Sequence, residues 1–178
     1  MNRIEWLRNH VYGRIVDIGC HNGEVFAGMP NVTGLDLDTW SPPYEKFVQG
    51  DAANLPFKDG EFDCAVLAEI LEHVADPVKV LKEARRVAKC VIISVPYEHN
   101  WPPELKPFHG LEGADDAAAT TGHPECKAAV DNNTMPHLYH IRYYMLDSLV
   151  ADIEAAGLKY KIEMLSYDGW CFFMGVLQ

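Results

Sequence analysis

The sequence has no long hydrophobic run, no excess of basic residues and no paired cysteine spacing. No apolar run approaches the length of a membrane-spanning helix, and Met1 to Trp6 lack the pattern of a signal peptide. Lys and Arg number 15 against 26 Asp and Glu, and this acidic balance argues against a nucleic-acid backbone as partner. Five cysteines without paired spacing indicate reduced thiols. These absences predict a soluble, cytoplasmic protein.

The chain of 178 residues is long enough for one domain with a single substantial core, residues 1–178, and it shows no internal repeat. Short apolar runs predict strands at residues 15–18, 31–35, 47–50, 62–67, 90–95, 158–164 and 170–177. Apolar residues at helical spacing predict helices at residues 2–10, 76–88 and 146–156. Asp168-Gly169 predicts a hairpin turn between the last two strands.

The segment from Ile15 to Gly23 organises the rest of the chain. Its apolar run reads as a buried strand, and Gly19 and Gly23 let the backbone that follows pass close to a ligand. Glu24 to Ala27 is predicted to start a short helix. Asp36 and Asp51 each follow a predicted strand, at the edge where open α/β sheets bind their ligands.

Four motifs, in this order, resemble those of the class I S-adenosylmethionine-dependent methyltransferases. They are Val16 to Gly23, Gly34-Leu35-Asp36, Gly50 to Phe57 and Phe62 to Val66. The resemblance implies a Rossmann-like α/β sheet of about seven strands, mostly parallel with a terminal antiparallel hairpin, and a minimal set of helices. His21 stands where this family usually has the middle glycine of a Gly-x-Gly-x-Gly loop.

The resemblance implies that S-adenosylmethionine is the cofactor. The residues that it places in the cofactor site are Asp17, Gly19, Cys20, His21, Gly23, Asp36, Leu37, Asp51, Ala52 and Ala68. Asp36 is expected to accept hydrogen bonds from the ribose hydroxyls, and Asp51 and the backbone of Ala52 are expected to face the adenine. Two prolines leave little room for a helix after Asp36, so Trp40 or Tyr44 is expected either to shield the adenosine or to pack under a loop.

The chemistry is expected at residues 69–73. Glu69, Glu72 and His73 are spaced i, i+3 and i+4, so a helical turn would place them on one face, where they could hold a divalent cation together with His140. These residues resemble the Glu-x-x-Glu-His motif, with a downstream histidine, of metal-assisted O-methyltransferases such as those of small RNAs and of the ubiquinone pathway. That resemblance implies catalytic roles for His73, His140 and Glu69. Similar residues also occur in class I methyltransferases that need no metal, where the glutamate and histidine only cap the helix or touch the substrate. Without a metal, His73 or His140 would be left as general base.

Residues 97–139 are rich in Pro, Gly, Ala, Asp and His and show little periodicity. A connection of this length is usually functional or disordered, and we interpret it as an insertion or lid over the substrate side. A structural zinc is a second metal hypothesis, with N and S ligands from His123, Cys126, His137 and His140.

Three classes of function remain. The leading one is a methyltransferase acting on the hydroxyl of a small molecule. The second is a non-catalytic S-adenosylmethionine-binding or interaction protein of the same fold, which would need no acidic cluster at residues 69–73. A nicotinamide-dependent oxidoreductase ranks last, because the spacing of Gly19 and Gly23 differs from Gly-x-Gly-x-x-Gly.

Overall fold

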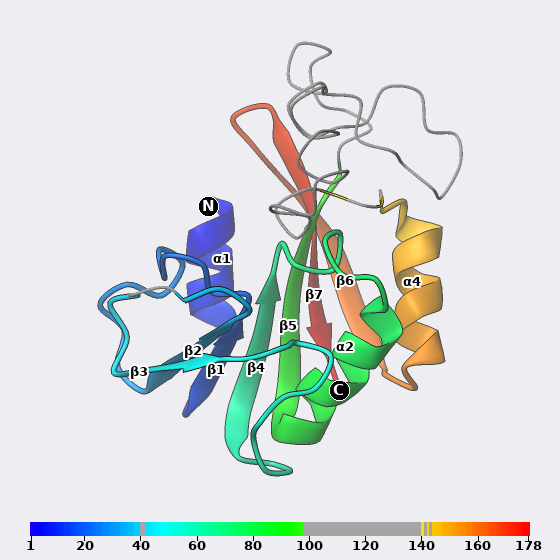
Figure 1. Ribbon diagram of the computed structural model, residues 1–178. Coiled ribbons are helices and arrows are strands. Elements are labelled where there is room, and N and C mark those ends of the chain that lie inside the picture. The colour runs from blue at the N-terminus through cyan, green and yellow to red at the C-terminus, as the bar shows by residue number, and fades with distance from the viewer. Residues whose placement is uncertain (40–41, 98–139, 141, 143) are drawn as a thin grey trace, which may run out of the picture.

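The computed structural model describes residues 1–39, 42–97, 140, 142 and 144–178 (Figure 1). Seven strands form one sheet in the order β3-β2-β1-β4-β5-β7-β6. The strands are β1 (Ile15–Ile18), β2 (Val32–Asp36), β3 (Lys46–Gln49), β4 (Phe62–Ala68), β5 (Ala88–Pro96), β6 (Tyr160–Tyr167) and β7 (Trp170–Leu177). The helices are α1 (Arg3–His10), α2 (Pro77–Val87) and α4 (Leu146–Ala155). Trp40 and residues 98–139, which include most of the predicted insertion, lie outside the described residues.

The first five strands are parallel, and the last two form an antiparallel hairpin at one side of the sheet. In this hairpin Tyr167 pairs with Trp170 around Asp168 and Gly169, whose φ angles of 50° and 81° are those of a tight turn. The order of the parallel strands reverses between β1 and β4, and open sheets bind ligands at such a point. The predicted fold class is therefore confirmed.

The helices cover both faces of the sheet (Figure 1). Helices α2 and α4 pack with one set of strand residues, and α1 packs with the set that faces the other way. The largest fully buried side chains are Phe26, Leu7, Ile18, Leu35, Leu67, Leu71, Leu81, Ile92, Ile93, Leu149, Ile153 and Met174. Among the described helices, none is both long and apolar enough to cross a membrane.

The helix ends follow from local sequence. Asn2 and Glu5 form a reciprocal capping box at the start of α1. Asp76 accepts a hydrogen bond from the backbone N–H of Lys79, directly before the proline that begins α2. Gly157, with a φ angle of 78°, ends α4 in the left-handed conformation that glycine favours. These three boundaries agree with the predicted helices.

Two local predictions were wrong. Glu24 to Ala27 do not form a helix; the described segment between β1 and β2 is built from turns, closed by bonds such as Met29 N–H to Phe26 O. Residues 69–73 likewise form a turn, because Glu69 has a φ angle of 55° and interrupts the right-handed backbone that a helical turn needs.

Candidate functional site

The loop after β1 is attached to the end of β2. The backbone N–H groups of Gly19 and Cys20 both donate to Leu35 O, at 2.7 and 3.0 Å. Gly19 has a φ angle of 75°, and a Cβ there would lie 2.6 Å from Cδ1 of Ile70. Glycine suits this position because the positive φ angle strains other residues and a Cβ would displace the end of the Ile70 side chain.

His21 takes the left-handed conformation as well, with a φ angle of 47°. Its backbone N–H donates to Oδ2 of Asp36 at 2.8 Å. The residue that departs from the family's glycine pattern therefore keeps a conformation that glycine favours, at a backbone cost of roughly 1–2 kcal/mol.

The two acidic residues at the strand ends are oriented by backbone groups. Asp36 accepts from His21 N–H on one oxygen and from Asp38 N–H, at 3.1 Å, on the other. Asp51 accepts from the N–H of Ala53 at 2.8 Å. Each carboxylate oxygen has two lone-pair sites, so these bonds fix the carboxylates and leave acceptor capacity toward a ligand.

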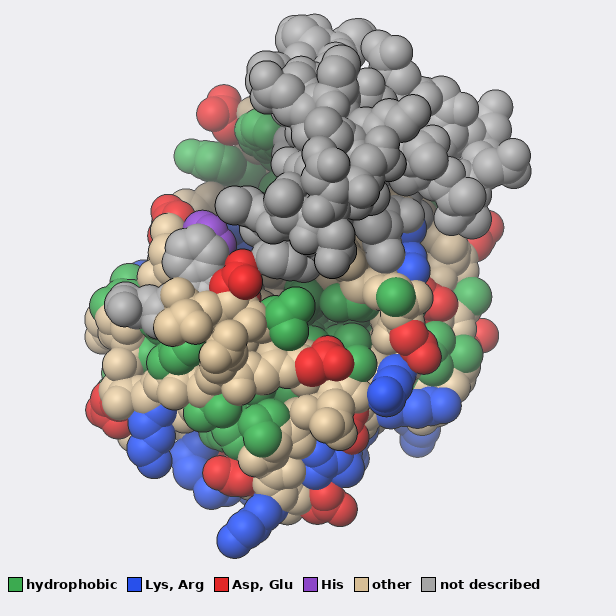
Figure 2. Space-filling view, viewed as in Figure 1, with side chains coloured by type: hydrophobic (Ala, Val, Ile, Leu, Met, Phe, Trp, Pro, Cys, Tyr) green, Lys and Arg blue, Asp and Glu red, His purple; other side chains and the backbone are tan. Residues whose placement is uncertain are grey.

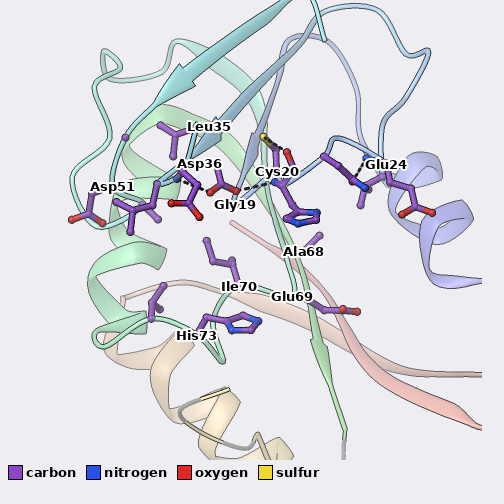
Figure 3. A pocket seen from close by; sticks show the side chains of 18 of the residues that line it. Gly19, Cys20, Glu24, Leu35, Asp36, Asp51, Ala68, Glu69, Ile70 and His73 are labelled. Atoms are coloured by element: carbon purple, nitrogen blue, oxygen red, sulfur yellow. Dashed lines mark hydrogen bonds between the residues drawn. The ribbon is translucent and has the colours of Figure 1, made fainter. Parts of the chain in front are cut away.

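A cavity of about 390 Å³ lies between this loop and the turn after β4 (Figure 3). In Figure 3, Asp36, Cys20 and Glu24 lie along one side, and His73, Ile70 and Glu69 lie along the other. Eight residues predicted to contact the cofactor line it: Gly19, Cys20, His21, Asp36, Leu37, Asp51, Ala52 and Ala68. Binding pockets for small molecules usually measure roughly 300–1,000 Å³, so the cavity has the size of a cofactor site.

Two predicted cofactor residues, Asp17 and Gly23, are not among the residues that line the cavity. A Cβ on Gly23 would lie 2.6 Å from Cβ of Pro42, so this glycine makes room for the proline segment. Asp17 is 2% exposed and accepts a hydrogen bond from the Tyr44 hydroxyl. Tyr44 thus packs under the loop, which is the second of the two roles predicted for it.

Sequence reasoning missed several lining residues, among them Arg3 at the start of α1. Its Nε lies 2.9 Å from Oε1 of Glu69, and its guanidinium carbon lies 5.6 Å from the ring centre of Phe172. The amphipathic pattern predicted α1 itself. The direction in which its first residue extends depends on tertiary packing, for which the sequence carries no local signal.

Glu72, His73 and His140 form a compact cluster beside the cavity. One ligand atom from each lies within 4.8 Å of the others, and the two imidazole rings meet edge to face at 4.6 Å. Burial lowers the pKa of His140 to about 4, so its ring is neutral at neutral pH. His73 also lines the cavity and joins the two features.

The structure thus gathers three of the four predicted metal ligands. Glu69 does not belong to this group, because the turn directs its carboxylate to Arg3. A carboxylate and two imidazoles are a ligand set that Zn²⁺ and Fe²⁺ accept in proteins, so the residues present fit a divalent cation. Of the alternative zinc set, His123, Cys126 and His137 lie outside the described residues.

The cavity also fits S-adenosylmethionine. Carboxylates at the ends of β2 and β3 can accept hydroxyl hydrogen bonds, and Leu35, Leu37 and Ala52 supply apolar surface for a base. Gly19 adds no Cβ between the loop and Ile70 on the opposite side of the cavity. The fit therefore rests on both shape and donor chemistry.

Comparisons with known proteins agree with this geometry. Residues 16–90 match the family model described as "Methyltransferase domain". Norajmaline N-methyltransferase of Rauvolfia serpentina is 33% identical over 48% of this chain and 36% of its own length. Ubiquinone biosynthesis O-methyltransferase of Dechloromonas aromatica is 31% identical over 49% of this chain and 46% of its own. The chain thus spans less than half the length of these relatives.

A solved structure with a similar fold is a SAM-dependent methyltransferase of Thermotoga maritima, described as a possible histamine N-methyltransferase. It superposes with a TM-score of 0.64 at 19% sequence identity, over 98% of this chain and 86% of that one. At this identity the likeness establishes the fold. The matched segment and the strand order are thus similar to those of the class I S-adenosylmethionine-dependent methyltransferases.

Proposed function

We propose that this chain binds S-adenosylmethionine and catalyses methylation of a hydroxyl group on a small molecule. The observation that carries the proposal is the position of His73, which both lines the cofactor-sized cavity and belongs to the cluster with Glu72 and His140. Acid–base groups therefore stand next to the cavity whose other parts suit a nucleoside. When bound, the cofactor supplies an electrophilic methyl group.

The end of the cavity near β2 and β3 suits the nucleoside. Asp36 offers two carboxylate oxygens, already fixed by backbone N–H groups, to the ribose hydroxyls. Asp51 and the backbone of Ala52, which also line the cavity, would face the adenine. Cys20 takes no part as a nucleophile, because burial raises the pKa of its thiol to about 12 and keeps it protonated.

The cluster supplies the chemistry that a hydroxyl acceptor needs. A hydroxyl must lose its proton when its oxygen bonds to carbon, and a neutral imidazole can take it, with a typical gain of about 10²–10⁴ in rate. His73 is the imidazole of the cluster that lines the cavity, whereas His140, with its pKa lowered to about 4 by burial, is a weak base. A divalent cation held by Glu72, His73 and His140 would add a second effect, because it lowers the pKa of a hydroxyl beside it.

Binding and turnover test the proposal separately. Calorimetry is expected to show binding of S-adenosylhomocysteine and none of NAD. Mass spectrometry of a panel of phenols, catechols and sugars is then expected to find methyl transfer, tested with and without chelator. Transfer only to amine acceptors would overturn the hydroxyl assignment, and full activity in chelator would remove the cation. Cofactor binding without transfer to any acceptor would favour the non-catalytic alternative.

A further inference from the structure

The cavity has an unusual balance of charge. The carboxylates that line it belong to Glu24, Asp36, Asp38, Asp51 and Glu69. Of the described residues that line it, only Arg3 carries a guanidinium or ammonium group. Most Lys and Arg side chains visible in Figure 2 lie toward the lower edge of the picture, where β4 begins. Among the described lining residues, Arg3 is therefore the one guanidinium that can pair with a negative group of a ligand.

Arg3 is held in place by two contacts. Its Nε lies 2.9 Å from Oε1 of Glu69, and its guanidinium stands over the ring of Phe172 in β7. The side chain is 22% exposed and that of Glu69 is 32% exposed, so both remain accessible from the cavity. A guanidinium has five N–H donors, and the contact with Glu69 is made through the one at Nε.

The pair also lies away from the end that suits the nucleoside. Figure 3 shows Glu69 and Asp51 far apart along the cavity, with Gly19 and Cys20 between them. A ligand with its ribose at Asp36 would extend past the loop toward Arg3 and Glu69. The charges met there are one positive and one negative, side by side, which matches the two charges of an α-amino acid.

Resting on the proposed function, we propose that Arg3 and Glu69 bind the amino-acid end of the cofactor. Arg3 takes the α-carboxylate through its terminal nitrogens, and Glu69 accepts from the α-ammonium. Arginine suits this role because its planar fork binds a carboxylate through two parallel hydrogen bonds. Without Arg3, the carboxylate of the ligand would face Glu69 with no opposite charge beside it. Glu69 is thus a binding residue and not a ligand of the nearby cluster.

Two ligands that differ only at this end test the assignment. S-adenosylhomocysteine carries the amino acid, and 5′-methylthioadenosine has the same thioether nucleoside without it. For Arg3→Gln, calorimetry is expected to show affinity for S-adenosylhomocysteine reduced about 10- to 100-fold, the usual worth of a charge-assisted bond. Its affinity for 5′-methylthioadenosine is expected to stay unchanged, which also shows that the cavity remains folded.

Matched variants complete the experiment. Arg3→Lys keeps the charge without the fork and is expected to fall between wild type and Arg3→Gln. Arg14→Gln removes another arginine–carboxylate pair, with Asp63, outside the cavity, and is expected to change neither affinity. Equal loss for both ligands in Arg3→Gln, or no loss for either, would overturn the assignment. Wild-type protein that binds 5′-methylthioadenosine but not S-adenosylhomocysteine would overturn the proposed function with it.

Discussion

The hydroxyl of Tyr44 donates a hydrogen bond of 2.7 Å to Oδ2 of Asp17 behind the loop that follows β1. Burial raises the pKa of Asp17 to about 7, while the Tyr44 hydrogen bond and the charge of Arg3 act in the opposite direction. A residue that sequence motifs place in the cofactor site thus supports the loop from within the protein. Its charge state depends on pH near neutrality.

Asp17 is expected to make stability fall as pH rises. Its pKa is 3.8 in the unfolded chain and about 7 in the folded protein. The folded state therefore holds a proton that the unfolded state has lost, and this stabilisation is fully present below about pH 4 and lost as pH rises through about 7. Each unit of pKa difference corresponds to about 1.4 kcal/mol.

Urea unfolding of wild type and Asp17→Asn across this range measures the effect. The asparagine keeps the acceptor for Tyr44 and cannot ionise, so the free energy of unfolding of wild type is expected to fall relative to that variant. Asp51→Asn changes an exposed carboxylate and serves as the control. Parallel pH curves for wild type and Asp17→Asn would show that burial does not shift this carboxyl.

Gly34 in β2 is expected to tolerate no side chain. A Cβ there would lie 2.8 Å from Sγ of Cys20, which is in the loop after β1, and 2.9 Å from Cδ2 of Tyr44, which packs under it. Gly34→Ala should therefore lower the free energy of unfolding by about 1–3 kcal/mol, the usual cost of overpacking. Gly50→Ala is the comparison variant, because its Cβ would lie 3.2 Å from Cδ1 of Leu35, a less severe overlap for which a smaller loss is expected. Equal unfolding midpoints for the two variants would contradict this packing.

The sequence predicted well those parts of the site that depend on strand ends. Parallel strands bring their carboxyl ends to one edge, so Gly19, Asp36 and Asp51 meet there whatever the loops do. Short apolar runs and proline or glycine at helix ends also carry local physical signals. For this reason the strands and the three described helices were found close to their true bounds.

The parts that were missed depend on backbone conformation or on contacts between distant elements. Spacing of i, i+3 and i+4 brings side chains together only on a helix, and the left-handed backbone at Glu69 removes that premise. Glu72 and His73 nevertheless meet His140, which lies far away in the sequence. The pairing of Arg3 with Glu69 spans two elements, and a pattern within one element does not reveal it.

Asp36 is expected to decide affinity for the nucleoside. Asp36→Asn keeps one acceptor oxygen and loses the charge, so binding of S-adenosylhomocysteine and of adenosine should weaken about 10- to 100-fold, as for other hydrogen bonds to charged groups. Asp38→Asn is the matched control, since Asp38 also lines the cavity but contacts Asp36 through its backbone N–H. Calorimetry with both ligands measures the effect. Equal losses in the two variants would point to general electrostatics instead of hydroxyl recognition.

Glu72 and Glu69 are expected to differ in their effect on a divalent cation. Glu72 is 1% exposed and lies with His73 and His140 in one group, whereas Glu69 contacts Arg3. If the group binds a cation, Co²⁺ should give ligand-field bands and raise the unfolding midpoint, because a ligand that binds only the folded state stabilises it. Glu72→Gln keeps the shape but removes the anionic ligand. Its affinity for Co²⁺ should fall by more than about 10-fold, because changing a residue that only supports a metal ligand already costs about that much. Glu69→Gln should leave Co²⁺ affinity unchanged while reducing affinity for S-adenosylhomocysteine. Equal Co²⁺ affinity in wild type and Glu72→Gln would exclude the cluster as the binding site, and the two histidines would then act only as acid–base groups.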